Sequence, residues 1–559
     1  MCGIALILGP AAAGAEDLFA GMLAALAPRG EVLETRCGPG LLAGTQRLRI
    51  VDRAAAVQPW PSADGRWVLC YNGELFNYRE LAAQLAALGA PPGGDGDTPV
   101  LAAAFGQWGE QAVGRFRGEF AFAIADTAAQ RLYLARDPLG VKPLYWARSG
   151  GTLHVASEIK ALVPLGQPVH EVPPGHHGWA TAAAGPDLTA YTSLAAGSSG
   201  AAGTGRARGS GQGPGASAEL VTDPAQAGAE LVTDPAQAAK LVRAAFEDSV
   251  RVRVDTDLTV GVILSGGLDS SLTLLHVAQM HPDCVAFTVG APGSDDLRYA
   301  RRLCAELGVP HEVVELAPRR IGRAQIRAAI EMSELTEYGD IINAVVSVPL
   351  FRLVSDAGVK VVLTGDGSDE LFGGYPMYHR ASPDQARRLF LHKIRNLART
   401  ELQRVDRTSM GHGVEARVPF LDPALVELAL ALPMDLKVRD GQEKWILREA
   451  FADLLPGYIR DRPKNPMSHS SGLHERARLY KPLFPGLHRF AGYDLCAPVR
   501  RDFSAVLEAC GNDLDLAIGQ LAARPDYTAR ERARDWAGAL KWNAVALARG
   551  AAGAGKHAR

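Results

Sequence analysis

The chain lacks an excess of charge of either sign: 59 Lys and Arg stand against 61 Asp and Glu, giving a formal net charge of −2. Proteins that bind nucleic acid or anionic membranes usually carry a basic excess, so we expect neither partner and favour small molecules. The sequence also has no apolar run of about 18 residues and no basic segment followed by an apolar core of signal length. We therefore expect neither a membrane span nor export.

Cysteine is sparse, and no two cysteines form a CxxC pair. This spacing argues against a zinc site and against a dense disulfide framework. A reducing compartment suits such a chain, so the sequence predicts a cytoplasmic protein. The seven cysteines are Cys2, Cys37, Cys70, Cys284, Cys304, Cys496 and Cys510.

The 559 residues exceed one ordinary core and predict two or three domains. Short alternating strands such as "GIALIL" and "FAFAIAD" predict antiparallel sheets in residues 2–180. Residues 181–234 are rich in Ala, Gly and Ser and contain a direct repeat of "AELVTDPAQA", which predicts a flexible linker beside a local duplication. From residue 235 to 548, strands followed by helices predict a parallel α/β domain with a helical extension, and residues 549–559 a disordered tail.

The start of the second domain carries a helix signal. In the second copy of the repeat, Asp234 is placed to cap a helix and Pro235 to open it. An amphipathic stretch follows, so we predict a helix over residues 235–252.

The chain opens "MCGIALILG", which places a cysteine at position 2. If Met1 is removed, Cys2 carries a thiol together with an α-amino group whose ordinary pKa, about 7.7–8.0, lets it act as the base for that thiol. This pairing is the logic of an N-terminal nucleophile hydrolase. Alternatively, Cys2 simply begins a buried strand, and these residues alone favour that interpretation.

The stretch "GVILSGGLDSS" (261–271) is the most specific in the chain. An apolar strand ends at Leu264, Ser265 and a glycine pair follow, and Asp269, Ser270 and Ser271 open a helix. Glycines allow close approach of a ligand, and the N–H groups of a helix start bind anions at the carboxyl end of a strand. Without a GKS or GKT sequence, the loop predicts a site for pyrophosphate rather than for γ-phosphate transfer.

A second acidic stretch, "LTGDGSDELFGG" (363–374), also follows an apolar strand. Parallel strands that end in such turns would bring Asp366 and Asp369 to the same sheet edge as Asp269. Carboxylates that face bound phosphates commonly share Mg²⁺, although a solvated loop is the simpler alternative. Glu415, Arg417 and Lys444, from "VEARVPFLD" and "QEKWILREA", would individually suit surface charges.

Taken together, the chain resembles the glutamine-dependent asparagine synthetase family over almost its full length, apart from the linker and tail. The resemblance implies an N-terminal class II glutaminase with the αββα sandwich of Ntn hydrolases, and a C-terminal ATP-pyrophosphatase domain. The matching segments are "MCGI", "QRLRIVD", "QPW", "YNGELFNY", "RDPLGVKPLYW", "SEIKAL", "PPG", "LSGGLDSS", "TGDGSDELFGGY", "DRTSMGHGVEARVPFLD", "KWILREA" and "RPKNPM".

The resemblance also implies site residues, named here by their positions in this sequence. In the glutaminase half, Cys2 would be the nucleophile, and Asn72 and Gly73 would form the oxyanion hole. Glutamine would be bound by Arg47 at its carboxylate and by Glu74 and Asp97 at its ammonium. The full set of implied glutamine-binding residues is Arg47, Val51, Asn72, Gly73, Glu74 and Asp97.

In the synthetase half, Asp269 and Asp369 would hold Mg²⁺. Asp366, Glu415 and Lys444 would take part in catalysis, with Lys444 stabilising charge during acyl-adenylate chemistry. The implied ATP-binding residues are Leu264, Ser265, Gly267, Asp269, Ser270, Val289, Thr364 and Gly365.

The implied reaction converts a carboxylic acid to an acyl-adenylate with ATP and Mg²⁺, releasing pyrophosphate. Ammonia freed from glutamine, as a thioester forms on Cys2, would then pass through a tunnel and attack the adenylate to leave an amide and AMP. The expected partners are glutamine, ATP and aspartate or another carboxylic acid, without nucleic acid or membrane, and a homodimer is an open alternative. In this context Cys2 is interpreted as a nucleophile.

The chain departs from the family at several places. "PRGEV" (28–32) stands where the family usually has "HRGPD", "GDTP" keeps only Asp97 of "SDxE", and Asp366 stands where many members carry Glu. The segment "ELTEYGDIINAVVS" (334–347) matches the asparagine-forming members loosely.

Three alternatives to aspartate amidation stay open. An amidotransferase of the same family could act on another carboxylic acid in specialised metabolism. A β-lactam synthetase is disfavoured, because those relatives tend to lack a working Cys2 and to have Tyr at the position of Asp366. A non-enzymatic homologue is disfavoured by the intact Cys2, Asn72, Asp269, Asp369 and Lys444.

Overall fold

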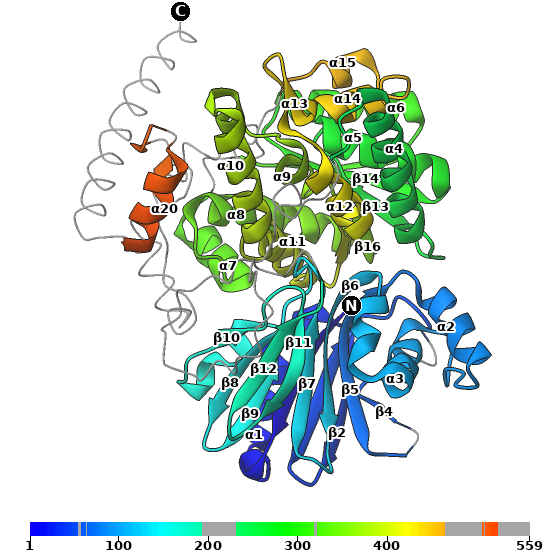
Figure 1. Ribbon diagram of the computed structural model, residues 1–559, viewed down its shortest axis with the longest axis vertical. Helices are drawn as coiled ribbons and strands as arrows, with labels where there is room; N and C mark the ends of the chain where they lie inside the picture. Colours follow the sequence, from blue (N-terminus) through cyan, green and yellow to red (C-terminus); the bar gives the residue numbers. More distant parts are fainter. Residues whose placement is uncertain are drawn as a thin grey trace, which may run out of the picture.

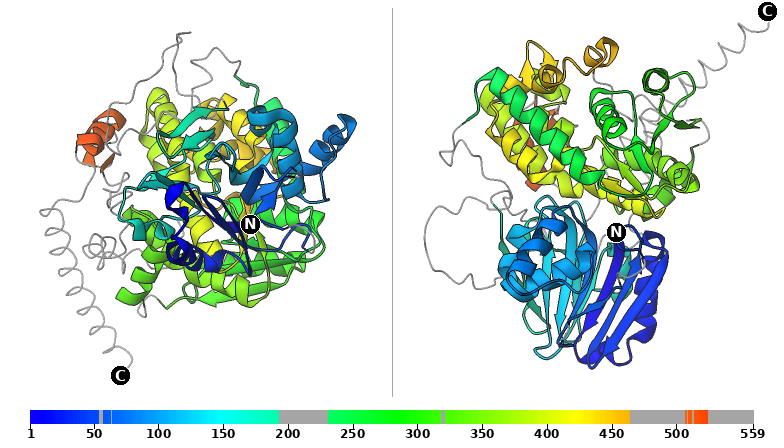
Figure 2. Two further views of the ribbon diagram at one scale, coloured as in Figure 1. Left: turned by 90° about the horizontal axis from the view of Figure 1, so that it is seen from below. Right: turned by 90° about the vertical axis from the view of Figure 1, so that its right-hand side faces the viewer.

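The computed structural model describes residues 1–53, 57–62, 64–192, 231–317, 321–463, 506–507, 509–511 and 513–523. Its N-terminal and C-terminal parts lie one above the other, and the N-terminus lies at the boundary between them (Figures 1 and 2). The predicted tail at 549–559 lies outside the described residues.

Two antiparallel sheets build the N-terminal part, as its alternating strands predict. The first sheet has six strands in the order β10 (His170–Glu171), β8 (Tyr145–Ser149), β9 (Thr152–Ala156), β1 (Cys2–Leu8), β3 (Leu41–Arg47) and β2 (Val32–Gly38). The second also has six, in the order β12 (Gly185–Ala190), β11 (His176–Thr181), β7 (Arg131–Arg136), β6 (Gly118–Asp126), β5 (Trp67–Leu75) and β4 (Trp60–Pro61).

Strand β1 is buried along its whole length because both of its faces are covered. Ile4 and Leu6 point into the core between the two sheets, whereas Ala5 and Ile7 pack under helix α1 (Glu16–Ala25). Helices α2 (Tyr78–Ala87) and α3 (Asp97–Trp108) cover the outer face of the second sheet. The resulting layers are helix, sheet, sheet and helix, the αββα sandwich that the resemblance implies.

The linker prediction is wrong at its N-terminal end. It began at residue 181, but β12 continues the second sheet as far as Ala190, paired in register with β11. Backbone pairing needs no large side chains, so a stretch rich in Ala and Gly can still add an edge strand. Residues 193–230, with the first copy of the repeat, lie outside the described residues.

The C-terminal part contains the predicted parallel sheet. Its five strands run in the order β15 (His311–Glu315), β14 (Cys284–Gly290), β13 (Val260–Ile263), β16 (Val361–Leu363) and β17 (Glu415–Arg417), all paired in parallel. A small hairpin joins β18 (Val438–Arg439) to β19 (Gln442–Glu443).

Helices surround this sheet. The predicted first helix is confirmed as α4 (Pro235–Arg253), and the side chain of Asp234 caps it by accepting a hydrogen bond from the Gln237 N–H at 2.7 Å. The other helices with described bounds are α5 (Leu268–Met280), α6 (Asp295–Leu307), α7 (Arg323–Ser333), α8 (Tyr338–Asp356), α9 (Ser368–Phe372), α10 (Pro383–Asn396), α11 (Glu401–Met410), α12 (Pro423–Ala431), α13 (Met434–Lys437), α14 (Trp445–Ala450), α15 (Gly457–Arg460) and α20 (Leu514–Ala523).

Two expectations from composition can be compared with the described residues. None of their helices combines the length and the apolar character that crossing a membrane requires. The cysteines among them are free.

An apolar cluster joins the two parts of the molecule. Residues of α1 and the first sheet, such as Phe19 and Ile7, belong to the same buried cluster as Ile330 of α7 and Ile342 of α8. Burial of this surface drives the association, but it does not fix the orientation, because hydrophobic contact is non-directional.

Buried ion pairs fix the orientation of the two parts relative to each other. Arg29, 1% exposed, binds Glu158 at 2.6 Å within the N-terminal part and Asp406 at 2.8 Å across the interface. Arg407 also binds Asp406, at 2.8 Å. Burial alone would raise the pKa of Asp406, but Arg29 and Arg407 outweigh it and hold that pKa well below the usual range. The interface therefore depends on an ionised Asp406.

We expect Asp406→Asn to destabilise the protein by about 3–5 kcal/mol, because it leaves two buried guanidinium groups without their shared carboxylate. Urea unfolding of the purified variant measures this loss. Asp187→Asn, on the exposed edge of β12, is the matched control and should change the free energy of unfolding by less than about 0.5 kcal/mol. Equal stability of the two variants would contradict the role given to Asp406.

Candidate active site

The first candidate site lies at the start of β1. Cys2 is 4% exposed, and its backbone N–H donates to Asn72 Oδ1 at 2.9 Å. The other amide atom of Asn72, Nδ2, is buried and has no hydrogen-bond partner among the described residues. A buried donor of this kind beside a thiol suits the oxyanion hole expected of Asn72, because it can bind charge that develops in a reaction.

The nitrogen of Cys2 is a peptide nitrogen in this chain, because Met1 precedes it. The Met1 ammonium is buried and lies 3.1 Å from Glu415 Oε2. Burial raises the pKa of the Cys2 thiol and outweighs the opposing effects of that ammonium and of Arg47. The thiol is therefore protonated at neutral pH, and its own α-amine becomes available as a base only once Met1 is removed.

Strand register places Arg47 directly opposite Cys2, where β3 ends. Its Nε lies 3.3 Å from Glu34 Oε2. Glu34, which also accepts a hydrogen bond from the Gln58 N–H at 3.0 Å, was missed in the sequence. No local pattern reveals it, because the pair forms between neighbouring strands. Gly73 follows Asn72 on β5, and Val51 packs beside Met1 after β3.

Asp97 and Glu74 are two buried carboxylates whose charges act on each other. Asp97 accepts hydrogen bonds from Tyr71 Oη at 2.8 Å and from the Leu75 N–H at 3.3 Å, and Glu74 lies 3.6 Å from Arg417 Nη2. Burial raises the pKa of Asp97, and raises that of Glu74 well above its usual range. A bound ammonium would stabilise both ionised forms, which suits the expected binding of glutamine.

Glu415, expected to be catalytic, lies at the interface. Besides the Met1 ammonium it binds Arg417 Nε at 2.6 Å. Burial alone would raise the pKa of Glu415, but Arg417 and that ammonium outweigh it and lower the pKa to about 2. Glu415 is therefore ionised at neutral pH, and through Arg417 it adjoins Glu74 of the first site.

The second candidate site begins with the predicted pyrophosphate loop, between β13 and α5. Ser270 Oγ accepts a hydrogen bond from the Ser265 N–H at 3.1 Å, and the Gly267 N–H donates to Ser265 Oγ at 3.3 Å. The loop thus folds onto the start of α5. Leu264, where the strand ends, accepts a hydrogen bond from Thr288 Oγ1 at 2.7 Å.

Lys444 joins the two acidic stretches. Its Nζ lies 2.5 Å from Asp269 Oδ2 and 2.5 Å from Asp369 Oδ1. Ser368 Oγ donates to Asp269 Oδ1 at 2.7 Å. The expected convergence of Asp269 and Asp369 at one sheet edge is confirmed, although Asp366 points elsewhere and binds Arg404 at 2.5 Å.

At this site the backbone comes close to the charged side chains, and the backbone of Lys444 is strained. Lys444 has a φ of 57°, in the left-handed region that non-glycine residues seldom adopt. A Cβ at Gly374 would overlap the Asp369 carboxylate and Lys444 Cε, and one at Gly365 would lie 3.0 Å from Asp269 Cβ. Glycine at these positions lets the charged groups meet.

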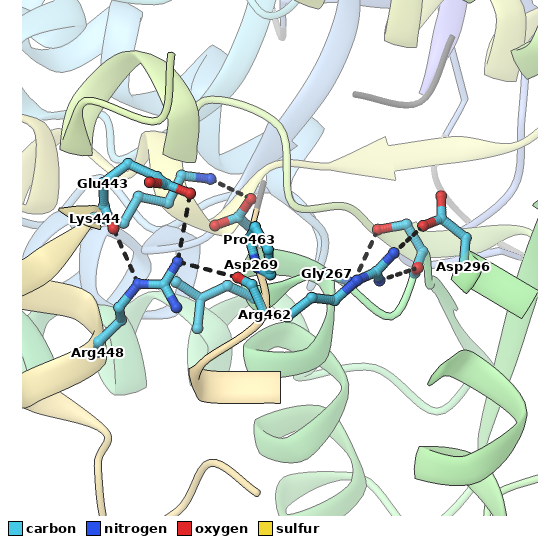
Figure 3. A pocket seen from close by; sticks show the side chains of 10 residues that line it. Gly267, Asp269, Asp296, Glu443, Lys444, Arg448, Arg462 and Pro463 are labelled. Atoms are coloured by element: carbon cyan, nitrogen blue, oxygen red, sulfur yellow. Dashed lines mark hydrogen bonds and ion pairs between the residues drawn. The ribbon is translucent and has the colours of Figure 1, made fainter. Parts of the chain in front are cut away.

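A pocket opens beside these groups (Figure 3). In that view Glu443, Lys444 and Arg448 lie on one side, Arg462 and Asp296 on the other, and Asp269 between them. Burial lowers the pKa of Arg448, with the Glu443 charge opposing it. Sequence reasoning gave no role to Asp296, Glu443, Arg448 or Arg462, although three of them stand in or next to the motifs "KWILREA" and "RPKNPM".

The remaining expected ATP contacts lie around the same sheet. Val289 is on β14, and Thr364 follows β16, where its N–H donates to the Arg417 carbonyl at 3.1 Å. Asp366 and Glu415 do not line the pocket that contains Asp269 and Lys444.

Asp269, which lines this pocket, and Asp369, which shares Lys444 with it, suit Mg²⁺ bound together with phosphates. No group of three or more His, Cys, Asp or Glu capable of holding a metal occurs among the described residues. Mg²⁺ characteristically takes one or two protein carboxylates and completes its coordination with water and substrate phosphates. Asp269 and Asp369, drawn together by Lys444, fit that requirement.

Comparison with known proteins finds a matching family for each part of the chain. A family described as "Glutamine amidotransferase domain" matches residues 1–176, and one described as "Asparagine synthase" matches residues 241–385 and 380–484. Asparagine synthetase B [glutamine-hydrolyzing] of Escherichia coli (strain K12) is 32% identical over 450 residues, 76% of this chain and 74% of that protein. The chain belongs to the glutamine-hydrolysing asparagine synthetase family.

Plant members of this family match similarly. Asparagine synthetase [glutamine-hydrolyzing] of Brassica oleracea is 32% identical over 451 residues, 76% of this chain and 70% of its own. Asparagine synthetase [glutamine-hydrolyzing] 2 of Oryza sativa subsp. japonica is 31% identical over 510 residues, which cover 84% of this chain and 78% of that protein. The described geometry also addresses the departure at "PRGEV": its surviving arginine, Arg29, donates to the Cys2 carbonyl at 3.1 Å and binds Asp406 across the interface.

We expect Gly374→Ala to reduce ATP-dependent AMP formation by about a hundredfold, because the added methyl group displaces Asp369 or Lys444, and a shift of about 1 Å can cost that much. Glutamine hydrolysis should be unchanged. Gly457→Ala is the control, since a Cβ there meets nothing within 4 Å. Unaltered AMP formation by Gly374→Ala would contradict the close packing assigned to this site.

Proposed function

We propose that the protein is a glutamine-dependent asparagine synthetase, with a glutaminase domain at residues 2–190, which includes β12, and a synthetase domain at 235–548. The single observation that carries the proposal is the meeting of Asp269, Asp369 and Lys444 above the pyrophosphate loop. Cys2 beside the unpartnered Asn72 amide supports a glutaminase in the same chain. The absence of CxxC pairs favours the cytoplasm as its location.

In the glutaminase half, we assign Cys2 as the nucleophile that attacks the glutamine amide carbon. Arg47 would bind the glutamine carboxylate, and Glu74 and Asp97 its ammonium. The Asn72 Nδ2 donor and the Gly73 N–H would stabilise the oxyanion, where one donor is worth about 2.7–4 kcal/mol. Ammonia is released as the thioester forms on Cys2, and water then hydrolyses the thioester.

In the synthetase half, the loop at Ser265, Gly267 and Ser270 would bind the pyrophosphate part of ATP. Asp269 and Asp369 would hold Mg²⁺, which neutralises phosphate charge when bound. Lys444 would stabilise the charge that develops as the carboxylate of aspartate attacks the α-phosphorus and pyrophosphate leaves. Ammonia then attacks the acyl carbon, and the products are asparagine and AMP.

Transfer of ammonia between the sites requires exclusion of water, since adenylate and ammonia would otherwise be lost. The interface offers buried polar groups between them: Glu74 adjoins Arg417, whose carbonyl accepts a hydrogen bond from Thr364, and the next residue, Gly365, packs on Asp269. We infer that ammonia crosses this interface.

The decisive assay measures AMP, pyrophosphate and asparagine formed by the purified protein from ATP, Mg²⁺ and glutamine, with and without L-aspartate. Aspartate-dependent AMP with asparagine in equal amount is the expected result. Glutamine hydrolysis without aspartate-dependent AMP would favour another acceptor acid, and ADP as the nucleotide product would refute the pyrophosphatase assignment.

Two variants should separate the half-reactions. Cys2→Ala should abolish glutamine-dependent synthesis and leave ammonia-dependent synthesis, because only the glutaminase loses its nucleophile. Lys444→Ala should lower AMP formation by at least about a hundredfold while glutamine hydrolysis persists, because it removes charge stabilisation in the second site alone. The measurement is AMP release with glutamine or with ammonium chloride as nitrogen source. Equal loss with both nitrogen sources in Cys2→Ala would contradict the two-site scheme.

A further inference from the structure

One wall of the pocket in Figure 3, formed by Arg462 and Asp296, has no part in the reaction as proposed. Arg462 follows α15, and Asp296 lies in the first turn of α6. Nη2 of Arg462 binds Asp296 Oδ1, and its Nη1 donates to the Ser265 carbonyl at 3.3 Å. This wall therefore contacts the pyrophosphate loop itself.

Neighbouring side chains hold Arg462 along the loop. Nη2 of Arg448 donates to the Arg462 carbonyl at 3.4 Å, and its Nη1 donates to the Arg460 carbonyl, so Arg448 positions the backbone of this segment. The Arg462 guanidinium lies over the Tyr299 ring, 4.3 Å from its centroid. Tyr299 packs directly against Gly266 of the loop. A cation stays attracted to a ring face within about 6 Å of the centroid, so this contact allows the guanidinium to shift.

Three cations line the described pocket, and they differ in what holds them. Lys444 lies between Asp269 and Asp369, the carboxylates that suit Mg²⁺. The guanidinium nitrogens of Arg448 donate to backbone carbonyls, which a ligand does not replace. Arg462 instead pairs with the carboxylate of Asp296. It is therefore the cation that can exchange a carboxylate for a phosphate.

Asp296 keeps a second source of stabilisation if Arg462 moves. Its side chain is 3% exposed, and it lies in the first turn of α6, a helix of 13 residues. The free N–H groups and the dipole at a helix N-terminus stabilise a negative charge. Exchange of partners by Arg462 therefore does not leave an unsupported buried carboxylate.

The pocket has little room and no surplus of positive charge while Arg462 binds Asp296. Its volume is about 40 Å³, enough for about three waters at 10–15 Å³ each, and pyrophosphate is much larger. Three carboxylates, those of Asp269, Asp296 and Glu443, line it beside the three cations. A shift of Arg462 from Asp296 onto a phosphate supplies both space and positive charge.

We propose that Arg462 binds the pyrophosphate part of ATP and returns to Asp296 when pyrophosphate leaves. The fork of arginine N–H donors matches two phosphate oxygens, and such charge-assisted hydrogen bonds are strong. Asp296 competes with the ligand for Arg462 and thereby promotes release of pyrophosphate, while Arg448 is a positioning residue. The inference rests on the proposed function and adds to it the control of product release.

The test measures the Kd for pyrophosphate, with Mg²⁺ in excess, by isothermal titration calorimetry on the full chain, so no turnover is needed. Arg462→Gln should raise this Kd at least about tenfold, because a hydrogen bond to a charged group is lost. Asp296→Asn should lower it about threefold or more, because Arg462 is no longer withheld by a competing charge. Arg462→Lys should give an intermediate Kd, since it keeps the charge without the fork.

Two controls accompany these variants. Arg460→Gln changes an exposed arginine of the same segment that pairs with Asp461 at 2.8 Å, and it should leave the Kd for pyrophosphate unchanged. AMP, which lacks the pyrophosphate part, should bind every variant with unchanged Kd. Glutamine hydrolysis by each variant reports that the chain is folded.

The outcomes separate this inference from the proposed function. Opposite shifts of the pyrophosphate Kd in Arg462→Gln and Asp296→Asn would support the exchange of partners. Weaker binding in both variants, as expected of a merely structural ion pair, or unchanged binding in either, would overturn the inference and leave the synthetase function intact. Failure of the unaltered protein to bind pyrophosphate with Mg²⁺ would refute the pyrophosphatase assignment and the inference together.

Discussion

The arrangement of both sites depends on charges buried where the two parts of the molecule meet. Separating Arg29 from Asp406 would break a buried ion pair away from water, leaving Arg29 with Glu158 and Asp406 with Arg407 as their remaining charged partners. The apolar contact between α1 and helices α7 and α8 tolerates sliding, but paired buried charges do not. Because Arg29 also donates to the Cys2 carbonyl, the same pairing fixes the nucleophile relative to the C-terminal sheet.

Arg417, a second buried charged residue at the interface, connects the two sites. Arg417 binds Glu415 and adjoins Glu74, and its carbonyl accepts a hydrogen bond from Thr364 at the end of β16. A ligand ammonium at Glu74 would compete with Arg417 for the same carboxylate. Arg417 lies on β17, whose neighbour β16 leads into the stretch that contains Asp369, so binding at Glu74 would act on a strand next to the second site.

Local pattern predicted those parts of the fold and site that local chemistry determines. The apolar run of β1, the cap at Asp234 and the loop around Gly267 each follow from a few adjacent residues, and all three are confirmed. The ion pairs of Arg47 with Glu34 and of Arg404 with Asp366 were not predicted, because the two residues of each pair meet only after strands and helices pack. Strand β12 escaped for a related reason: pairing with β11 outweighs weak side-chain propensity.

The conformation of Lys444 in the synthetase site is energetically unfavourable in itself. Lys444 adopts a left-handed φ of 57° and is 2% exposed between two carboxylates. Backbone strain of this kind costs about 1–3 kcal/mol and persists only where surrounding contacts impose it. Gly374 and Gly365 let the backbone come close to Asp369, Lys444 and Asp269. The ammonium is thus positioned before substrate arrives, so little reorganisation remains when charge develops in the reaction.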